Sequence, residues 1–454
     1  MMKLPDSLMN SLTNANGFNR EAFEAVHTSG EQITSIRINP NKIKDNAVLP
    51  FTIDTLPPVP WTTNGYYLPE RPSFTFDPLF HAGTYYVQEA SSMFVEQALR
   101  QTTDLSQPLK VLDLCAAPGG KSTHLQSLIS PHSLLVSNEV IRSRANILKD
   151  NIIKWGADNV VITNNDPAHF KPLTGYFDVI LVDAPCSGSG LFRRDEEAIA
   201  EWSEDNVNLC CQRQQRILAD IWPCLKEGGI LIYSTCSFSQ KEDEDIVQWM
   251  VEEYNALVKP LTLQAEWGIV AGENGYRFWP DQVKGEGFFL ACLQKQTPEA
   301  EVAIKTKRKT ESPAKSQLTG IQQWLAPAAA QQFIVHEQTV YAWSGMLLTQ
   351  GSFLLDKLKV IYSGTKLGEL MRDKLIPDHA LAMNPALQGK IQSADLDHDD
   401  AIAFLQRKDI KQLPATKGWQ LAAYKGHALG WMNVFPNRIN NYYPKELRIL
   451  KDSL

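Results

Sequence analysis

The sequence predicts an α/β fold built on a mostly parallel, Rossmann-like sheet, with a smaller module before it and a β-rich region after it. First, short apolar runs alternate with helical patterns from Leu109 onward, as in βαβ units. Second, 454 residues exceed what one hydrophobic core usually supports. Third, residues 294–317 are rich in Lys, Thr, Ser, Pro and Glu, which is the composition of a linker.

Five strands are expected in the central region, at residues 110–115, 134–139, 159–163, 178–183 and 229–235. Four of them end at a polar or thiol side chain. Ligands of open α/β sheets bind at the carboxyl ends of the strands. Cys115, Glu139, Asp183 and the residue that follows Thr235 should therefore point toward one crevice.

We expect five segments along the chain. Residues 1–105 form an N-terminal module and residues 106–293 the Rossmann-like domain. The linker, residues 294–317, leads to an intermediate β-rich module at 318–395 and a C-terminal β-rich module at 396–454.

Composition and charge exclude several classes of protein. Hydrophobic residues make up 43% of the chain and charged residues 21%, which are ordinary globular values. No apolar stretch is long enough to span a membrane, and the first residues lack the apolar core of a signal peptide, so we expect a cytoplasmic protein, by default a monomer. Residues 1–300 carry 24 Lys and Arg against 37 Asp and Glu, whereas residues 301–454 carry 20 against 14. A polyanionic partner is therefore to be sought at the C-terminal end.

The cysteines indicate reduced thiols rather than disulfides or a metal site. Their number is odd and their spacing fits no zinc motif. All seven lie in the middle of the chain: Cys115, Cys186, Cys210, Cys211, Cys224, Cys236 and Cys292.

Residues 111–129, VLDLCAAPGGKSTHLQSLI, predict a strand, a Gly/Pro turn and a helix. Gly119 and Gly120 allow the backbone to approach a ligand closely, and the helix N-terminus can donate amide hydrogens to it. A phosphate-binding loop would need glycine at position 115, where this chain has Cys115. A purely structural tight turn is the other interpretation.

Two acids follow the next strands. Glu139 lies about twenty residues after the glycines, the spacing at which a carboxylate binds the ribose hydroxyls of an adenosine. Asp166 is placed to meet the adenine or its amine, although an Asp before Pro167 equally suits a turn.

Cys186 and Cys236 lie among small polar residues at loops, in VDAPCSGSG and YSTCSFS. A pair of thiols suits methylation at carbon 5 of cytosine, because that carbon becomes nucleophilic only after a thiolate adds to carbon 6. Asp183 is positioned to stabilise the charge that develops on the ring. The alternative for any cysteine is a small buried hydrophobe, which suits Cys292 and the three cysteines expected on a helix over residues 205–225.

The motifs DLCAAPGGK, Glu139, Asp166, DAPCSGSG and YSTCS occur in the same order as in the Nop/Sun family of RNA cytosine-5 methyltransferases, which the chain closely resembles. The resemblance implies an S-adenosylmethionine-dependent enzyme in which Cys236 is the nucleophile and Cys186 assists product release. It also implies that the methyl donor is bound by Cys115, Ala116, Ala117, Pro118, Gly119, Gly120, Lys121, Glu139, Asp166 and Asp183.

The terminal regions narrow the resemblance. Segments such as SIRINP and YYVQEASSM, together with the C-terminal half, are similar to the F type of bacterial 16S ribosomal RNA methyltransferase, whose last module is PUA-like. This implies RNA-binding modules at both ends, and 16S rRNA or the small ribosomal subunit as partner. Asp281 stands where many members of the family have His, and any role of Arg193 and Arg194 in guiding RNA stays open.

The last segment alternates basic and aromatic residues, a pattern that suits contacts with an RNA backbone and stacking on bases. The other interpretation is a solvated basic face over an aromatic core. The residues are Lys425, Arg438, Lys445 and Arg448 with Tyr424, Trp431, Phe435, Tyr442 and Tyr443.

Two rival functions remain on these residues. In the first, the reaction is the same but Cys186 is the nucleophile, because the Pro185–Cys186 pair matches the Pro-Cys thiol of DNA cytosine methyltransferases. In the second, the protein is an RNA-binding ribosome assembly factor without catalytic turnover.

Overall fold

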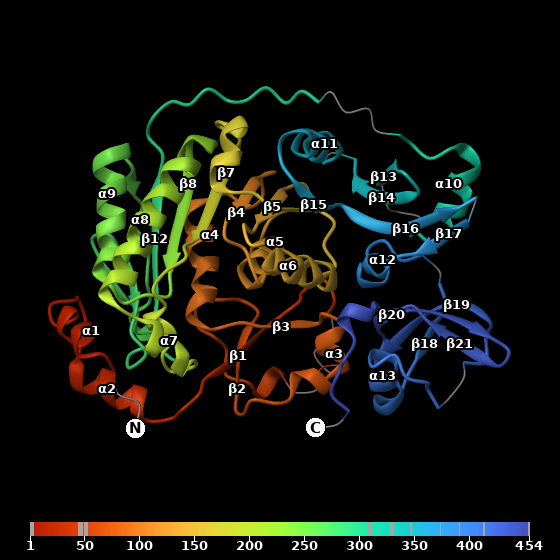
Figure 1. Ribbon diagram of the computed structural model, residues 1–454, viewed down its shortest axis with the longest axis horizontal. Coiled ribbons are helices and arrows are strands. Elements are labelled where there is room, and N and C mark those ends of the chain that lie inside the picture. Colours follow the sequence, from red (N-terminus) through yellow and green to blue (C-terminus); the bar gives the residue numbers. More distant parts are fainter. Residues whose placement is uncertain are drawn as a thin grey trace.

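The computed structural model describes residues 4–43, 49, 53–306, 311–326, 331–345, 347–372, 374–389, 391–411 and 414–452. A large mixed sheet forms the body of the molecule, and the C-terminal modules lie beside it (Figure 1). The predicted α/β class with a Rossmann-like sheet is confirmed.

The central sheet has ten strands, nine of them in the order β10-β11-β12-β8-β7-β4-β5-β6-β15, while β9 pairs with β12. Strands β8, β7, β4, β5 and β6 are parallel. They correspond to the five predicted strands. Their apolar runs are continuous because both faces of these strands are buried under helices. Their bounds are β4 Lys110–Asp113, β5 Leu134–Asn138, β6 Val160–Thr163, β7 Phe177–Asp183 and β8 Leu225–Thr235. The antiparallel strands are β9 Leu257–Val258, β10 Val270–Gly272, β11 Gly275–Phe278, β12 Phe288–Gln294 and β15 Val360–Ser363.

Helices cover both faces of this sheet. On one face, α4 (Val95–Thr102), α5 (Gly120–Leu128) and α6 (Arg142–Trp155) pack through residues such as Leu148. On the other, α8 (Glu204–Ile221), α9 (Glu244–Tyr254) and α11 (Leu348–Lys357) pack through residues such as Ile217. The helix expected to reach residue 225 ends at Ile221, because Pro223 cannot continue an α-helix, so Cys224 lies in a short 3-10 turn instead.

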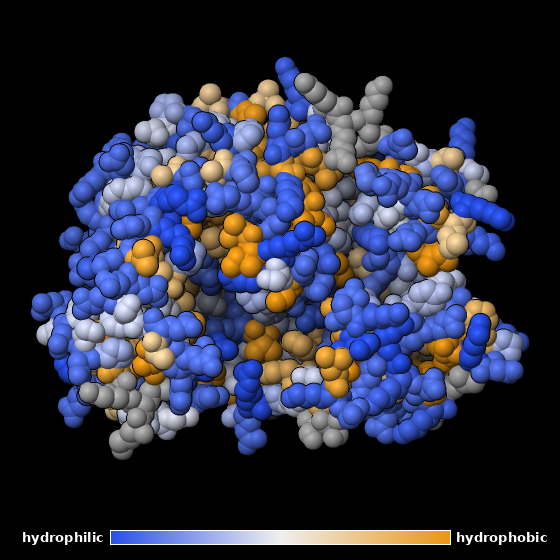
Figure 2. Space-filling model, viewed as in Figure 1, coloured by the Kyte–Doolittle hydropathy of each residue, from blue (hydrophilic) through white to orange (hydrophobic). Residues whose placement is uncertain are grey.

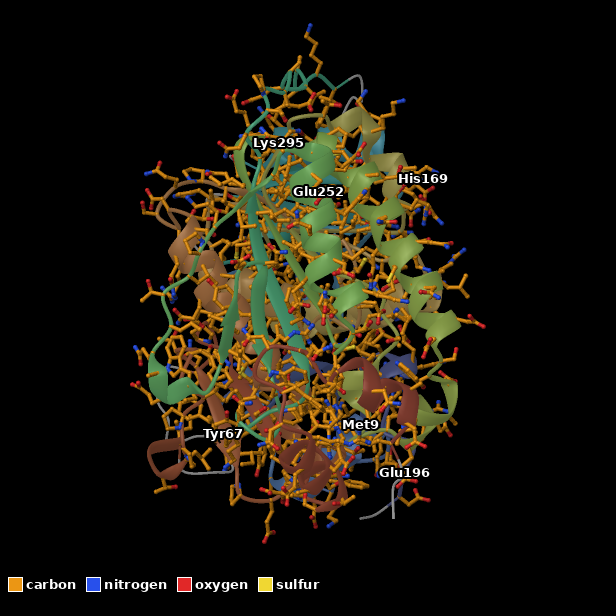
Figure 3. The ribbon with its side chains drawn as sticks, turned by 90° about the vertical axis from the view of Figure 1, so that its left-hand side faces the viewer. Met9, Tyr67, His169, Glu196, Glu252 and Lys295 are labelled. Atoms are coloured by element: carbon orange, nitrogen blue, oxygen red, sulfur yellow. The ribbon has the colours of Figure 1, made fainter. Side chains whose placement is uncertain are left out.

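The N-terminal region forms a small sheet of order β2-β1-β3 with short helices around it. Its helices α1 and α2 share a buried cluster with Phe238 and Trp279 of the body. Figure 3 shows Met9 of α1, Tyr67 of β2 and Glu196 of α7 at the end of the molecule opposite Lys295, which follows β12. The bounds are α1 Asp6–Ser11, α2 Arg20–Thr28, β1 Thr34–Ile38, β2 Gly65–Leu68, α3 Pro78–His81, β3 Tyr85–Val87 and α7 Glu196–Glu201.

Two four-stranded sheets follow, β13-β14-β16-β17 and β18-β19-β20-β21. Between β14 and β16 of the first sheet, the chain leaves the β-rich region to form β15, which pairs antiparallel with β6 and extends the central sheet. The bounds are α10 Lys315–Gln322, β13 Gln331–His336, β14 Thr339–Ser344, β16 Thr365–Met371, β17 Lys374–Pro377, α12 His379–Met383, β18 Ser393–Asp395, α13 His398–Leu405, β19 Gly418–Tyr424, β20 His427–Phe435 and β21 Arg438–Asn441.

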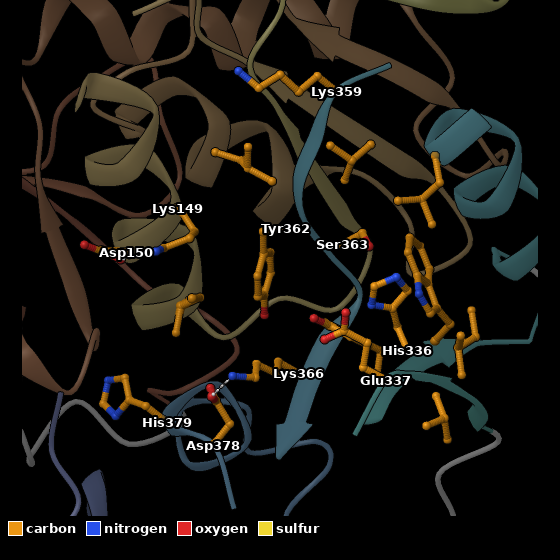
Figure 4. A pocket seen from close by; sticks show the side chains of 18 of the residues that line it. Lys149, Asp150, His336, Glu337, Lys359, Tyr362, Ser363, Lys366, Asp378 and His379 are labelled. Atoms are coloured by element: carbon orange, nitrogen blue, oxygen red, sulfur yellow. Dashed lines mark ion pairs between the residues drawn. The ribbon is translucent and has the colours of Figure 1, made fainter. Parts of the chain in front are cut away.

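A cavity of about 830 Å³ lies where α6, β15 and the β13–β17 sheet meet. Figure 4 shows Tyr362 near its middle, with the ion pair between Lys366 and Asp378 below it. Within the described parts of the chain, no helix combines the length and apolarity needed to cross a membrane. The face seen in Figure 2 is mainly hydrophilic and is hollowed near its centre.

Candidate active site

The structure brings Cys186 and Cys236 together. Cys186 lies in the loop after β7, Cys236 is the first residue after β8, and these strands are parallel neighbours. The two sulfur atoms are 3.1 Å apart, although fifty residues separate them in the chain. Both thiols are free and partly accessible. A pair of thiols at this distance can act on one carbon atom of a bound base.

The acidity of the Cys186 thiol is shifted by its surroundings. The hydrogen bond with the Cys236 sulfur, burial and the nearby Glu242 carboxylate together raise the pKa of the Cys186 thiol well above its ordinary value. These neighbours favour the protonated form of Cys186. Either sulfur can be the donor in the contact between the two thiols.

Backbone contacts bind the two cysteine loops to each other. The amide of Gly190 donates to the carbonyl oxygen of Cys236 at 2.7 Å, and the amide of Phe238 donates to the Ser189 hydroxyl at 2.9 Å. A β-carbon on Gly190 would come within 2.6 Å of the Cys236 carbonyl oxygen. Glycine is therefore required here, because any side chain would push the loops apart.

Lys121 and Asp183 form an ion pair beside the thiols. The Lys121 ammonium is 2.8 Å from Asp183 Oδ2, and the Ser234 hydroxyl donates to Asp183 Oδ1 at 2.7 Å. Burial alone would lower the pKa of Lys121, but the Asp183 carboxylate raises it. The Lys121 ammonium therefore stays charged, and it lies within electrostatic reach of the Cys236 sulfur.

A second acid, Asp113, lies buried below this pair and was not singled out from the sequence. The Ser122 hydroxyl donates to its Oδ2 at 2.7 Å, while its Oδ1 has no partner among the described residues. Burial, with the Asp183 charge, raises the pKa of Asp113 to about 7. Burial also raises the pKa of the Cys115 thiol, so Cys115 is an uncharged lining residue.

Hydrogen bonds to β5 and α6 hold the glycine turn after β4. The amide of Ala116 donates to the carbonyl oxygen of Asn138, and Gly119 adopts a φ of 117° that favours glycine. The carbonyl oxygens of Ala117 and Pro118 accept hydrogen bonds from Arg144 and Asn151 of α6, at 3.0 and 2.8 Å. Gly120 begins α5, so free amides of its first turn face the turn.

Arg37 of the N-terminal sheet supports this turn from outside, and the sequence reasoning missed it. Its guanidinium is fully buried, donates to the Gly120 carbonyl oxygen at 3.2 Å and lies over the Trp155 ring. Burial lowers its pKa to about 9. The signal was present in the charged residue at the centre of the apolar segment SIRINP.

Glu139 and Asp166 lie after β5 and β6, and their carboxylates differ in how many hydrogen-bond partners they already have. Glu139 is buried and accepts only the Ile141 amide, at 2.9 Å, with the Arg144 guanidinium 3.7 Å away. It keeps lone pairs for a ligand. The Asp166 carboxylate accepts the Ala168 amide and both its oxygens face Arg216, at 3.2 and 3.3 Å. The turn-forming interpretation of Asp166 therefore describes part of its role.

These residues suit a cationic nucleoside. Three carboxylates, at Asp113, Glu139 and Asp183, surround the Cys115 thiol, whereas Lys121 is already paired with Asp183. Acidic side chains of this kind match the positive sulfonium of a methyl donor. Among the described residues, no group of His, Cys, Asp and Glu side chains has the arrangement of a metal site.

Other singled-out residues take structural positions. Cys210, Cys224 and Cys292 are buried, Cys211 is partly so, and all four have a raised pKa caused by burial. Arg193 is also buried, and its guanidinium binds the carbonyl oxygens of Glu31 and Gly285. It joins the N-terminal module to the catalytic body, whereas Arg194 is exposed. Asp281 is partly buried, which raises its pKa.

Some aromatic residues of the basic and aromatic set at the C-terminal end are buried, and others are exposed. Trp431 and Tyr443 belong to the core, which agrees with the interpretation of an aromatic core beneath a basic face. Phe435 and Tyr442 are 36% and 38% exposed. Arg438 lies over the Phe435 ring, so a stacking surface of limited size is accessible.

Three sequence families match successive parts of the chain. Residues 4–90 match the N-terminal domain of 16S rRNA methyltransferase RsmF, residues 101–294 match 16S rRNA methyltransferase RsmB/F, and residues 392–449 match the methyltransferase RsmF PUA domain. The ribosomal RNA small subunit methyltransferase F of Psychromonas ingrahamii is 31% identical over 86% of this chain and 85% of its own length. That of Aeromonas salmonicida is also 31% identical, over 91% and 90%.

Solved structures agree on the fold. A methyltransferase homolog protein from Pyrococcus horikoshii is 29% identical with a TM-score of 0.50, covering 64% of this chain and all of its own. NSun6 from Pyrococcus horikoshii with SFG has a TM-score of 0.54 at 19% identity, covering 65% of this chain and 99% of its own.

Fold and site together define a Rossmann-like methyltransferase that depends on S-adenosylmethionine. Within this class, the chain belongs to the family of the ribosomal RNA small subunit methyltransferases F, with its PUA module at the C-terminal end.

Proposed function

We propose that the protein methylates carbon 5 of a cytosine in RNA, with 16S ribosomal RNA of the small subunit as substrate. The names of its relatives state methylation of small-subunit ribosomal RNA for them, and the matching family is described as a 16S rRNA methyltransferase. The observation that carries the proposal is the pair of sulfur atoms 3.1 Å apart beside the Lys121–Asp183 ion pair. Methylation at a ring nitrogen or a ribose oxygen would need no pair of thiols.

In the proposed reaction, the Cys236 thiolate adds to carbon 6 of the cytosine. Lys121 supports this thiolate, while Asp183 stabilises the charge that develops on the pyrimidine. Carbon 5 thereby becomes nucleophilic. S-adenosylmethionine, when bound, supplies the methyl group as an electrophilic sulfonium substituent.

Release reverses the addition. Loss of the carbon 5 proton to water restores the double bond between carbons 5 and 6, and the bond from carbon 6 to sulfur breaks with its electrons moving to Cys236. The Cys186 thiol lies 3.1 Å from that sulfur, and by donating its proton toward it would stabilise the departing thiolate. We therefore propose Cys236 as nucleophile and Cys186 as the residue that assists release.

Residues that would hold the methyl donor surround the glycine turn. Glu139 is the proposed acceptor for the ribose hydroxyls, and Asp166 borders the adenine. The remaining proposed contacts come from Cys115, Ala116, Ala117, Pro118, Gly119, Gly120, Lys121 and Asp183.

Trapping of the RNA adduct tests the roles of the thiols. Cys186→Ala should accumulate a covalent protein–RNA complex on denaturing gels, whereas Cys236→Ala should form none. The opposite pattern would make Cys186 the nucleophile. RNA binding without any calorimetric binding of S-adenosylmethionine would instead favour a non-catalytic assembly factor.

A further inference from the structure

A buried carboxylate that the proposed reaction does not use lies directly behind the two thiols. Glu242 follows the Cys236 loop, in the turn that precedes α9, and its side chain is completely inaccessible. The Tyr233 hydroxyl donates to its backbone carbonyl oxygen at 2.6 Å, which holds the residue in place. Burial raises the pKa of the Glu242 carboxyl, although hydrogen bonds from Ser187 and Ser237 oppose this.

The Glu242 carboxylate contacts the residue that follows each cysteine. Its Oε1 accepts the Ser187 amide at 2.8 Å, and its Oε2 accepts the Ser187 hydroxyl at 2.6 Å. The same Oε2 accepts the Ser237 hydroxyl at 2.6 Å. A single side chain thus bridges the two loops from which Cys186 and Cys236 project.

A further side chain completes the arrangement. The amide nitrogen of Gln214, on α8, lies 3.5 Å from Glu242 Oε1 and donates to the Pro185 carbonyl oxygen at 3.1 Å. Glu242 thus faces only donors among these contacts, which suits an ionised carboxylate. A hydrogen bond that involves an ionised partner is stronger than a neutral one, so the bridge is stiff.

We propose that Glu242 is a positioning residue that sets the juxtaposition of the two sulfur atoms. Other contacts between the loops do not replace it: the Gly190–Cys236 and Ser189–Phe238 hydrogen bonds do not reach Ser187 beside Cys186. The Ser187 and Ser237 hydroxyls are 3.5 Å apart, a longer contact than the 2.6 Å bonds that each makes to Glu242. The inference rests on the proposed roles of the two cysteines in catalysis, but the geometry that it concerns can be measured without RNA.

The test compares Glu242→Gln with Glu252→Gln, which changes an exposed carboxylate on α9. Brief treatment with diamide should form the Cys186–Cys236 disulfide in the wild type and in Glu252→Gln, as measured by peptide mass spectrometry. In Glu242→Gln the rate should fall about tenfold, and kcat for RNA methylation should fall about 100-fold with KM for RNA unchanged, because small misplacement of reacting groups is costly.

A folded Glu242→Gln with wild-type disulfide formation and kcat would overturn the proposal. A Glu242→Gln variant with lower kcat, higher KM and lower thermal stability would also overturn the proposal, because the role of Glu242 would then be merely structural. If Glu242→Gln does not fold, Ser237→Ala decides, since it leaves Glu242 and its bonds to Ser187 in place and removes the Glu242 contact on the Cys236 side, together with the bond from the Ser239 amide. It should lower the disulfide rate and kcat about threefold or more, and unchanged values would contradict the proposal.

The two proposals fail separately. If the wild type transfers no methyl group to cytosine but Glu242→Gln still slows disulfide formation, the proposed function fails and the positioning role stands. If cytosine is methylated and Glu242→Gln alters neither rate, only the positioning role fails.

Discussion

At the scale of single residues, the site depends on charges whose neighbours set their protonation. Lys121 is paired with Asp183, and Cys186 is held as a thiol by the sulfur next to it. In the proposed reaction, these states would divide the work between two similar groups, with the Cys236 sulfur attacking the base and Cys186 keeping its proton.

Replacement of Asp183 should therefore impair chemistry far more than folding. We expect Asp183→Asn to slow single-turnover methyl transfer about 100-fold. An amide carries no charge to balance the Lys121 ammonium, and it stabilises charge on the base less well than a carboxyl group does. Asp178→Asn is the matched control: Asp178 is the second residue of the same strand and pairs with Lys226 at 2.7 Å, at the strand end opposite Asp183. Equal losses in both variants would argue against a role of Asp183 in the reaction.

The pH dependence of stability should report on Asp113. Because its pKa is raised from 3.8 to about 7, the folded protein binds this proton more tightly than the unfolded chain does. The resulting stabilisation is complete below the unfolded pKa and is lost as the pH rises through the folded one. Asp113→Asn carries no such proton. Its melting temperature, relative to wild type, should thus be higher at about pH 8 than at about pH 5. A difference that does not vary with pH would contradict this.

At the scale of elements, the C-terminal half is joined to the cofactor side of the sheet through β15. The Asn164 amide donates to the Lys359 carbonyl oxygen at 3.0 Å, and the Lys359 amide donates to Asn165 Oδ1 at 3.1 Å. The Lys359 ammonium also binds Asn164 Oδ1, at 2.8 Å. The loop that carries Asp166 is therefore held by a strand from beyond the linker.

Asn165→Ala should loosen this loop and weaken binding of S-adenosylmethionine about fivefold, because it removes buried hydrogen bonds worth about 1 kcal/mol. Isothermal calorimetry measures the change. The control is Asn274→Ala, which removes hydrogen bonds at the β10–β11 turn. An unchanged affinity in Asn165→Ala would show that β15 does not support the cofactor site.

At the scale of the whole molecule, charge is divided between an acidic body and a mildly basic C-terminal part. Lys425 and Arg438 are exposed beside the Tyr424 and Phe435 rings. If an RNA strand binds on this surface, the two basic side chains would neutralise some of its phosphates, and the counterions of those phosphates would be released.

The double variant Lys425→Glu, Arg438→Glu should weaken RNA binding about tenfold at constant salt and reduce the salt slope by about two. Filter binding at several salt concentrations checks both. Lys408→Glu with Lys451→Glu changes the same charge elsewhere in the module and should have a smaller effect. Equal effects of the two pairs would mean that the attraction is not local.

Local patterns were sufficient for the five parallel strands of the central sheet, whereas the roles of the motif residues stay predictions. The five strands are apolar runs buried on both faces, and periodicity identifies such runs without knowledge of their neighbours. It was less reliable at boundaries, as the end of α8 before Pro223 illustrates. It also did not separate exposed from buried aromatics, so Trp431, which is fully buried, was grouped with accessible rings.

The sequence by itself determined the α/β class, the strand ends at which the functional side chains lie, and the family. Only the tertiary structure decided that the sulfurs of Cys186 and Cys236 meet at 3.1 Å, that Glu242 binds behind both, and that β15 completes the sheet beside the cofactor loop. The physical reason is that propensity and periodicity act over neighbouring residues, whereas these contacts join residues far apart in the chain and depend on which strands pack side by side.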